Sequence, residues 1–216
     1  MVSLDPGARS PAAAPAPVVT VRGVLELLFP PSCVVCGAPS TPLCGPCASA
    51  LVPAEPRDPP DGLAAVWSLV DYDGVGRALV TSLKYDGRRD AVRVLGAAMG
   101  QLPDRRVDVV TWAPTSPSRR RSRGFDQAQL LAAATARTLG TRDRRLLERP
   151  EGRTQTGHDR TERLSGPRFT ARGRAPRRVL VVDDVLTTGA TLSAAAATLR
   201  SAGAGEVLGM TLASVR

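Results

Sequence analysis

The chain has 216 residues and a formal net charge of +9, with 29 basic and 20 acidic residues. At roughly 150 residues per domain, this length predicts one domain with a smaller appendage. Hydrophobic residues make up 43% of the sequence but aromatic residues only 3%, so we expect a core of Ala, Val and Leu. No long apolar run and no apolar segment behind a basic N-terminus are present, so we expect no membrane span and no secretory signal. A cytoplasmic protein is predicted.

The positive charge is concentrated in residues 105–178, which hold 19 arginines against 7 acidic residues, a balance of +12. Such a segment is typical of proteins that bind an anionic partner, such as phosphate or nucleic acid. A solvated basic face has the same composition. Lys84 is the only lysine, which excludes a GxxxxGK[ST] phosphate loop. His158 is the only histidine, which argues against a Ser-His-Asp triad and against a histidine-rich metal site.

The N-terminal part of the chain divides into three predicted segments. Residues 1–17 are rich in Ala and Pro and are predicted to be a disordered tail. Residues 18–29 carry apolar side chains at helical spacing and predict a short helix in front of a cysteine cluster. This helix and the cluster form a predicted module over residues 18–52. Residues 53–62 contain four prolines and predict a linker to the main domain, residues 63–216.

The main domain alternates between strand-like and helix-like patterns. The predicted elements are, in chain order, a strand at 63–72, helices at 75–83 and 90–101, a strand at 107–113, a helix at 126–139, a strand at 179–182, a helix at 190–202 and a strand at 207–215. Strands that alternate with helices are typical of a parallel sheet covered on both faces. We therefore predict an α/β fold.

All four cysteines lie in two C-x-x-C pairs, Cys33 with Cys36 and Cys44 with Cys47. Two such pairs present four thiolates from two tight turns, which is a ligand set for tetrahedral Zn²⁺. Four cysteines leave no open coordination position, so this zinc would be structural. Disulfides and an iron–sulfur cluster use the same residues, and a cytoplasmic location argues against the disulfides.

The most informative segment runs from Val179 to Leu192. Four apolar residues predict a buried strand, and Asp183 and Asp184 follow at its carboxyl end, where open α/β sheets bind ligands. The turn at 187–191 then opens a helix, and backbone N–H groups in such a turn form an anion site. A phosphate held there would leave both carboxylates close to an attached sugar, able to accept from hydroxyls or to hold hydrated Mg²⁺. A Walker B strand and a receiver domain share part of this pattern, but the partner loop of the first and the downstream lysine of the second are absent.

This segment resembles the phosphoribosyl-pyrophosphate (PRPP) motif of type I phosphoribosyltransferases, and residues 24–215 as a whole resemble the ComF family of competence proteins. The motifs that agree are, in order, Pro-Pro-x-Cys-x-x-Cys with a second cysteine pair, Tyr72-Asp73-Gly74, Leu83-Lys84-Tyr85-Asp86-Gly87, Arg123-Gly124-Phe125-Asp126-Gln127-Ala128, Thr154-Gln155-Thr156 and the PRPP motif itself. The resemblance implies a type I phosphoribosyltransferase-like parallel sheet flanked by helices, with a small N-terminal four-cysteine zinc module.

The resemblance also implies roles for single residues. Asp183 and Asp184 would meet the ribose hydroxyls and Mg²⁺ as the catalytic pair. The groups around the 5′-phosphate would be Thr187, Thr188, Gly189, Ala190 and Thr191. The groups near the pyrophosphate would be Ala113, Pro114, Thr115 and Ser116, with Arg121 and Arg123 beside them. Lys84 and Tyr85 are further candidates for contact with the ligand, although they also fit an ordinary helix end. Residues 149–169 correspond to a mobile loop that closes over PRPP and contain Arg153, Thr154, Gln155 and Arg163.

The sequence departs from the family pattern at two places near the pyrophosphate loop. Trp112-Ala113-Pro114 stands where the family usually has Val-Pro, and Asp126 stands where it usually has Asn. These departures would affect how the substrate is positioned more than whether PRPP binds.

The resemblance implies a Mg²⁺-dependent transfer of the phosphoribosyl group from PRPP to an unknown acceptor. The family's link to natural transformation implies an alternative, an accessory protein of DNA uptake. In that case the +12 segment and the cysteine module would bind single-stranded DNA, and PRPP would be a regulator or a relic. A third interpretation is a regulator that senses PRPP without turnover.

Overall fold

The computed structural model describes residues 32–39, 41–85, 90–150 and 167–216. The predicted tail at 1–17, the predicted helix at 18–29, the turn after Tyr85 and the residues Arg153 to Arg163 lie outside the described residues. Within the described part of the chain, no helix is both long enough and apolar enough to cross a membrane.

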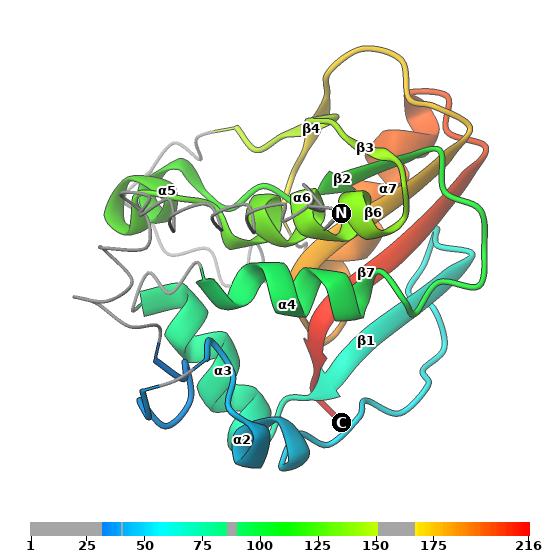
Figure 1. Ribbon diagram of the computed structural model, residues 1–216. Helices are drawn as coiled ribbons and strands as arrows, with labels where there is room; N and C mark the ends of the chain where they lie inside the picture. The colour runs from blue at the N-terminus through cyan, green and yellow to red at the C-terminus, as the bar shows by residue number, and fades with distance from the viewer. Residues whose placement is uncertain (1–31, 40, 86–89, 151–166) are drawn as a thin grey trace, which may run out of the picture.

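A five-stranded parallel sheet forms the centre of the main domain (Figure 1). Its strands lie in the order β1-β7-β6-β2-β3, and every neighbouring pair is parallel. Their bounds are Ala65–Asp71 for β1, Glu206–Ser214 for β7, Arg178–Leu186 for β6, Val109–Trp112 for β2 and Arg142–Asp143 for β3. A separate antiparallel pair joins β4, Leu147–Glu148, to β5, Thr170–Ala171.

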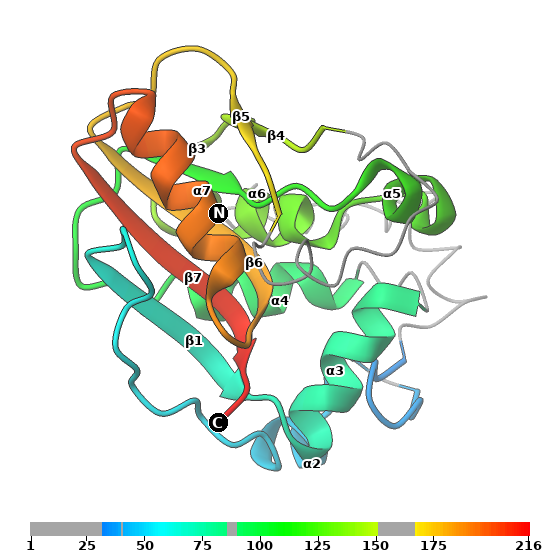
Figure 2. The same ribbon diagram turned by 180° about the vertical axis from the view of Figure 1, so that it is seen from behind.

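Helices cover both faces of this sheet (Figures 1 and 2). One face carries α3 (Gly74–Tyr85), α4 (Asp90–Met99) and α6 (Gln127–Thr138), and the other carries α7 (Ala190–Ser201). Successive residues of β6 pack alternately against the two layers: Leu180 and Val182 lie in the first core cluster, Val179 and Val181 in the second. The predicted α/β class with a parallel sheet covered on both faces is confirmed.

Each element predicted in the main domain is present, and no end moves by more than four residues. The largest difference is at β6, which continues to Leu186 instead of ending at Val182, so Asp183 and Asp184 lie within the strand. Sequence analysis missed the helices α2, Gly45–Ser49, and α5, Pro117–Arg123, and the strands β3, β4 and β5.

The cysteine module packs beside α3 (Figures 1 and 2). Val34, which directly follows the first cysteine, is buried in the same cluster as α3, α4 and α6. Residues 52–54 run along β1: the Asp71 N–H donates to the Val52 carbonyl over 2.8 Å and the Ala54 N–H to the Leu69 carbonyl over 3.3 Å. The start of the predicted linker therefore pairs with the sheet. The bounds of the domains stay a prediction.

Candidate functional site

The carboxyl ends of β2 and β6 border a cavity of about 260 Å³, which we call the main cavity. Nine of the predicted site residues line it, namely Lys84, Ala113, Pro114, Thr115, Arg123, Asp183, Asp184, Thr187 and Thr191. They come from α3, from the loop after β2, from α5 and from the end of β6 with the turn that follows. The fold thus brings together four segments that are far apart in the sequence.

The other predicted site residues do not line this cavity. Thr188 and Gly189 form the turn in front of α7, and Ala190 is the first residue of that helix. Ser116 caps the N-terminus of α5, where it accepts the Arg119 N–H over 3.4 Å. Tyr85 is the last residue of α3, and its side chain is outside the description.

The arginines of α5 divide by helical geometry. Arg119 and Arg123 are four residues apart, so they share one face of the helix, and both line the main cavity. Arg121 does not line it. The helix was not predicted from the sequence, and Arg121 rather than Arg119 was placed beside Arg123 near the pyrophosphate. Ser116 before the helix, Pro117 at its first turn and Gly124 at its end (φ 73°) were capping signals that predict the helix.

The two adjacent acids of β6 have different surroundings. The Asp184 carboxylate forms an ion pair with the Lys84 ammonium over 2.8 Å. The Asp183 carboxylate accepts the Asp184 N–H over 2.8 Å. Burial and the Asp184 charge raise the pKa of Asp183 well above its usual range, while the Lys84 charge acts in the opposite direction. A cation next to both carboxylates would favour the ionised form of Asp183.

The turn after β6 is held by residues from the predicted linker. Gly189 has φ 81° and sits under Pro60, where a Cβ would lie 2.5 Å from the proline Cγ, so only glycine fits. Arg57 donates to the Thr187 carbonyl over 3.3 Å and to the Val215 carbonyl over 2.7 Å. The backbone of the turn is therefore fixed from outside the cavity.

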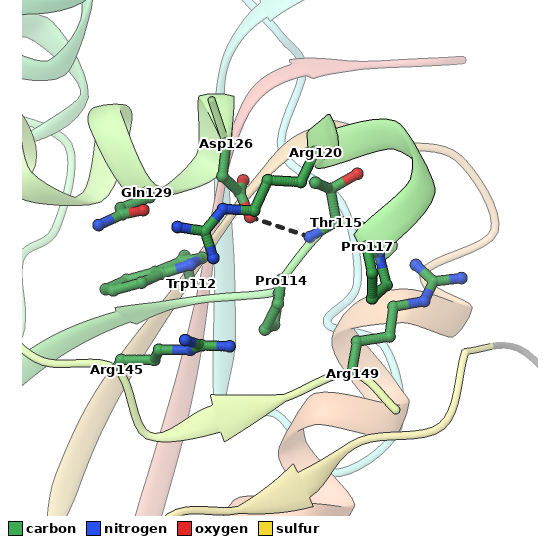
Figure 3. A pocket seen from close by; sticks show the side chains of 9 residues that line it. All are labelled: Trp112, Pro114, Thr115, Pro117, Arg120, Asp126, Gln129, Arg145 and Arg149. Carbon is green, nitrogen blue, oxygen red and sulfur yellow. Dashed lines mark hydrogen bonds between the residues drawn. The ribbon is translucent and has the colours of Figure 1, made fainter. Parts of the chain in front are cut away.

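Asp126 joins the loop after β2 to the start of α6 (Figure 3). Its carboxylate is buried and accepts the Thr115 N–H over 3.0 Å and the Ala128 N–H over 3.2 Å. Burial raises the pKa of Asp126, and the backbone donors oppose this. An asparagine has one acceptor oxygen and would turn its NH₂ group toward one of these N–H donors. This chain therefore uses both oxygens of an aspartate to fix the loop.

Gln127 connects three elements at the rim of the main cavity. Its side-chain oxygen accepts from the Arg123 guanidinium over 3.2 Å, and its NH₂ group donates to the Lys84 carbonyl over 3.4 Å. The ends of α5 and α3 are thereby tied to the start of α6. In the sequence, Gln127 stands out only as part of a motif, without an expected role of its own.

Arg149 was also missed as a cavity residue, although it opens the segment that corresponds to the mobile loop. It is half-buried and lines the main cavity from the end of β4. Burial and the nearby Arg119 charge lower the pKa of Arg149, and the Asp183 charge opposes them. No local pattern in the sequence marks this position, because tertiary folding alone brings it to the cavity.

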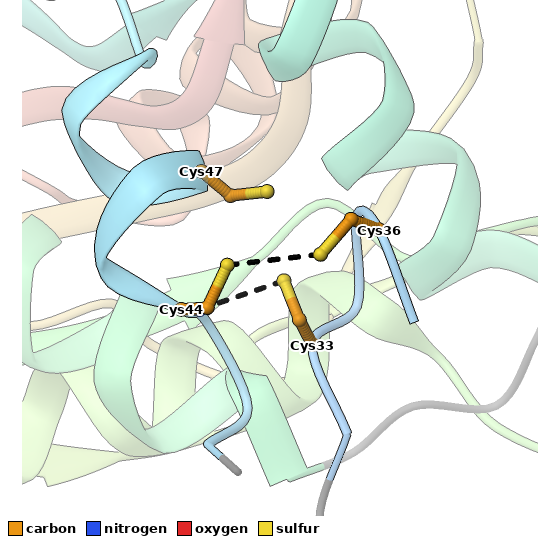
Figure 4. Close-up of side chains that lie close together, drawn as sticks. All are labelled: Cys33, Cys36, Cys44 and Cys47. Atoms are coloured by element: carbon orange, nitrogen blue, oxygen red, sulfur yellow. Dashed lines mark hydrogen bonds between the residues drawn. The ribbon is translucent and has the colours of Figure 1, made fainter. Parts of the chain in front are cut away.

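The four cysteines form a compact cluster (Figure 4). Their sulfur atoms all lie within 4.8 Å of one another, and Cys36 Sγ lies 3.7 Å from Cys44 Sγ. A tetrahedral site with Zn–S bonds of about 2.3 Å has sulfur atoms about 3.8 Å apart. Bonded sulfur atoms would be about 2.05 Å apart, so these cysteines are free thiols. The geometry fits a metal ion held by four thiolates.

The thiols of this cluster influence one another's ionisation. Burial opposes ionisation of Cys33, but the N–H groups of Cys36 and Cys44 outweigh it and lower the pKa of its thiol to about 6. Contact with Cys44, followed by burial, raises the pKa of Cys47 to about 12. Four thiolates this close together repel one another, and a divalent cation between them removes that obstacle.

The fold defines a class: an α/β protein with a type I phosphoribosyltransferase-like parallel sheet and a four-cysteine cluster at its N-terminal side. A scan against models of protein families finds no match. A relative from Escherichia coli O6:H1, DNA utilization protein YhgH, is 30% identical over 193 residues, covering 81% of this chain and 80% of that protein. The chain belongs to the ComF family.

Competence protein ComFC of Streptococcus pneumoniae is 38% identical to this chain over 97 residues. That match covers 44% of this chain and 42% of the relative. The chain thus matches less than half the length of this competence protein.

Two solved structures share part of the fold. One is the glutamine PRPP amidotransferase from B. subtilis complexed with ADP and GMP, with a TM-score of 0.42 and 26% identity. The other is described as the allosteric regulatory enzyme of purine biosynthesis, with a TM-score of 0.42 and 25% identity. Each match covers 57% of this chain and 26% of the other.

Proposed function

We propose that the chain binds PRPP together with Mg²⁺ in the main cavity and transfers the phosphoribosyl group to an acceptor. The observation that carries this proposal is the meeting of Lys84, Thr115, Asp183 and Thr187 around one cavity at the carboxyl edge of the sheet. Membership of the ComF family supports it. The anion-binding turn and the paired carboxylates are the two features that a phosphorylated sugar requires.

Each wall of the main cavity has a proposed role. The turn at 187–191 holds the 5′-phosphate through its N–H groups and threonine hydroxyls. Asp183 and Asp184 accept from the ribose hydroxyls. They also offer the carboxylate oxygens that Mg²⁺ prefers, and the metal supplies charge neutralisation of the pyrophosphate. Lys84 and Arg123 add positive charge where the pyrophosphate leaves.

Transfer breaks the bond between the anomeric carbon and the pyrophosphate oxygen and forms a bond from that carbon to the acceptor. The electron pair of the broken bond leaves with the pyrophosphate, and the proton of the acceptor goes to solvent. Such a reaction needs positioning and charge stabilisation more than covalent help. The fixed loop at 113–116 and the cations around it suit that requirement.

The test is calorimetric titration of PRPP with Mg²⁺ into the wild-type chain and the double variant Asp183→Asn/Asp184→Asn. Binding is expected in the wild type and lost in the variant, while the exposed variant Asp143→Asn keeps it. Micromolar affinity in the double variant would contradict the assignment. Isotope-detected release of pyrophosphate from PRPP, with and without candidate bases or single-stranded DNA, separates an enzyme from a sensor.

We also propose that the cysteine cluster holds one structural Zn²⁺. The sulfur spacing supports it, because it matches a tetrahedral four-thiolate site. Elemental analysis of protein purified under reducing conditions is expected to find about one zinc per chain, from four thiolates per site. Iron with visible absorbance would point to a cluster instead.

A second candidate function is the handling of single-stranded DNA, with PRPP binding regulatory or vestigial. The relatives are named for competence and for DNA utilization, and Arg119, Arg120 and Arg121 are exposed on α5. Replacing these three arginines with Ala is expected to flatten the salt dependence of binding by up to about two units, at ~0.7 per phosphate. Displacement of DNA by PRPP and Mg²⁺ would place both in one anion site. Undetectable DNA binding at ~50 mM salt would contradict direct contact.

A further inference from the structure

A second cavity of about 180 Å³ borders the loop at 113–116 (Figure 3). Its lining residues are Trp112, Pro114, Thr115, Pro117, Arg120, Asp126, Gln129, Arg145 and Arg149. Four of them, Pro114, Thr115, Asp126 and Arg149, also line the main cavity. The two cavities therefore share a wall, and Arg149 borders both.

Three arginines enter the second cavity from three parts of the chain. Arg120 comes from α5, Arg145 from the segment between β3 and β4, and Arg149 from the residue after β4. Figure 3 shows Arg120 and Arg145 on either side of Trp112. Trp112 is only 5% exposed and belongs to the core, so its side chain forms a fixed wall between them.

The positive charge in this cavity is weakly compensated. Among the residues that the structure describes, neither Arg120 nor Arg149 has an acidic group within ion-pair distance. Arg145 lies 3.8 Å from Glu148, which is also shared with Arg172 at 3.4 Å.

Asp126, the one acid in the lining of the second cavity, already accepts from two backbone N–H groups. Burial raises the pKa of Asp126, whereas the backbone donors and the nearby Arg120 charge oppose this. Three guanidinium groups therefore face a single carboxylate in this lining, and this excess of positive charge forms a site for an anion.

Size and donor chemistry narrow the choice of anion. At about 180 Å³ against about 260 Å³, this cavity is smaller than the main cavity, so it suits a smaller group than PRPP. The planar fork of arginine matches phosphate oxygens in a bidentate manner. A compact phosphate-type oxyanion satisfies both conditions.

We propose that the second cavity binds inorganic phosphate or pyrophosphate as a site separate from the main cavity, and that the two sites communicate through Arg149 and the shared loop. An anion in the second cavity attracts the Arg149 guanidinium and adds negative charge next to the loop at 113–116. Binding there therefore opposes binding of an anion in the main cavity. Anion binding in the second cavity does not depend on the proposed function. Its effect on PRPP binding does depend on the proposed function.

The test begins with calorimetric titration of sodium pyrophosphate into the full chain without added Mg²⁺. The variant Arg145→Gln changes the second cavity alone, and Lys84→Gln changes the main cavity alone. The exposed variant Arg142→Gln lies on β3, lines neither cavity and serves as the matched control. At least a tenfold loss of affinity is expected for one class of sites in Arg145→Gln, with that class retained in Lys84→Gln and Arg142→Gln.

A second measurement locates the occupied site. The chain has two tryptophans, so Trp67→Phe leaves Trp112 as the reporter at the cavity wall. Phosphate is expected to change the Trp112 fluorescence of this variant and to lose that effect when Arg145→Gln is added. Circular dichroism verifies that each variant is folded, and Arg145→Lys, which keeps the charge but not the fork, is expected to bind with intermediate affinity. Equal binding by wild type and Arg145→Gln, with loss in Lys84→Gln, would overturn the second site.

PRPP then separates this inference from the proposed function. In the wild type, saturating phosphate is expected to weaken binding of PRPP with Mg²⁺ about fivefold or more, as coupled sites typically do. That effect should vanish in Arg145→Gln, which itself binds PRPP normally. If Arg145→Gln weakened PRPP and pyrophosphate equally, the second cavity would be part of the PRPP site and the inference would fail. If PRPP bound to no protein while pyrophosphate binding still required Arg145, the inference would stand and the proposed function would fail.

Discussion

Asp183 and Asp184 show how two identical side chains acquire different properties in one cavity. Asp184 has its counter-charge in Lys84, at 2.8 Å. The nearest donor to Asp183 is the uncharged N–H of Asp184, at 2.8 Å. Burial and the neighbouring carboxylate therefore raise the pKa of Asp183. The folded state holds this proton more tightly than the unfolded state does.

The free energy of unfolding should therefore depend on pH through Asp183. Because the pKa is raised on folding, the folded state is penalised as pH rises from the ordinary value of 3.8 through the raised value. Asp183→Asn removes this penalty and keeps an oxygen for the Asp184 N–H. We expect a higher Tm than wild type at pH 8, by about 2–4 °C for each kcal/mol recovered, and a smaller difference at pH 4.

Calorimetric melting at the two pH values measures this difference, with Asp143→Asn on β3 as a control for removal of an exposed acid. A Tm for Asp183→Asn below wild type by the same amount at both pH values would contradict the pKa argument. The same substitution is expected to weaken PRPP binding with Mg²⁺, so stability and function oppose each other at this residue.

The turn between β6 and α7 is held in place by a residue that is distant from it in the sequence. Arg57 contacts the Thr187 carbonyl, the Ser214 hydroxyl and the Val215 carbonyl. Arg57→Met is expected to reduce the free energy of unfolding by about 0.5–1.5 kcal/mol, the net value of a hydrogen bond, because the site is exposed. Loosening of the turn in Arg57→Met should weaken PRPP binding. Arg57→Lys should bind PRPP more tightly than Arg57→Met but more weakly than wild type. Denaturant titration measures the free energy of unfolding, and calorimetry measures the PRPP affinity. An unchanged PRPP affinity would show that the turn keeps its conformation without Arg57.

How far the sequence predicts an element depends on the length of its pattern. The apolar run of β6 and the Ala-rich pattern of α7 extend over enough residues to be recognised, and both were predicted. Strands β3, β4 and β5 have two residues each, which is too short for any period to show. Helix α5 has no apolar face, and only its caps indicate it.

The same reasoning applies to the candidate site. Motif residues such as Asp183 and Thr187 were predicted because they come after an apolar run, at the edge of the sheet where α/β proteins bind ligands. Arg149 and Arg145 were not, because each reaches its cavity through the path of a loop and not through a local pattern. The role of Asp126 required knowledge of which two N–H groups its oxygens meet.

At the scale of the whole molecule, the cysteine cluster and the main cavity are mechanically connected. Val34 packs into the hydrophobic core together with Leu79 and Leu83 of α3, and the last turn of α3 places Lys84 in the cavity wall. Cys33→Ser, or removal of the proposed zinc by a chelator, should therefore loosen α3 and displace Lys84. We expect loss of at least ~4 kcal/mol of stability, a single melting transition at lower temperature and weaker PRPP binding.

Scanning calorimetry and PRPP titration of the same samples measure these effects. Restoring zinc to the chelated wild type should reverse them, whereas zinc should not rescue Cys33→Ser. Two separate transitions, with the main one unchanged, would mean that the cysteine module and the sheet unfold independently.

The path of residues 52–54 along β1 has a consequence for the state of association. β1 is the outermost strand on its side of the sheet, and the Asp71 N–H and the Leu69 carbonyl are both occupied by this segment. Pro53 faces outward next to them and has no N–H to offer to a further strand. A chain shortened to begin at Leu63 would expose the free groups of β1, which act as a template for strands of other molecules. Such a chain is expected to scatter light and sediment as multimers, while the full chain, with this cover in place, does not add strands at β1.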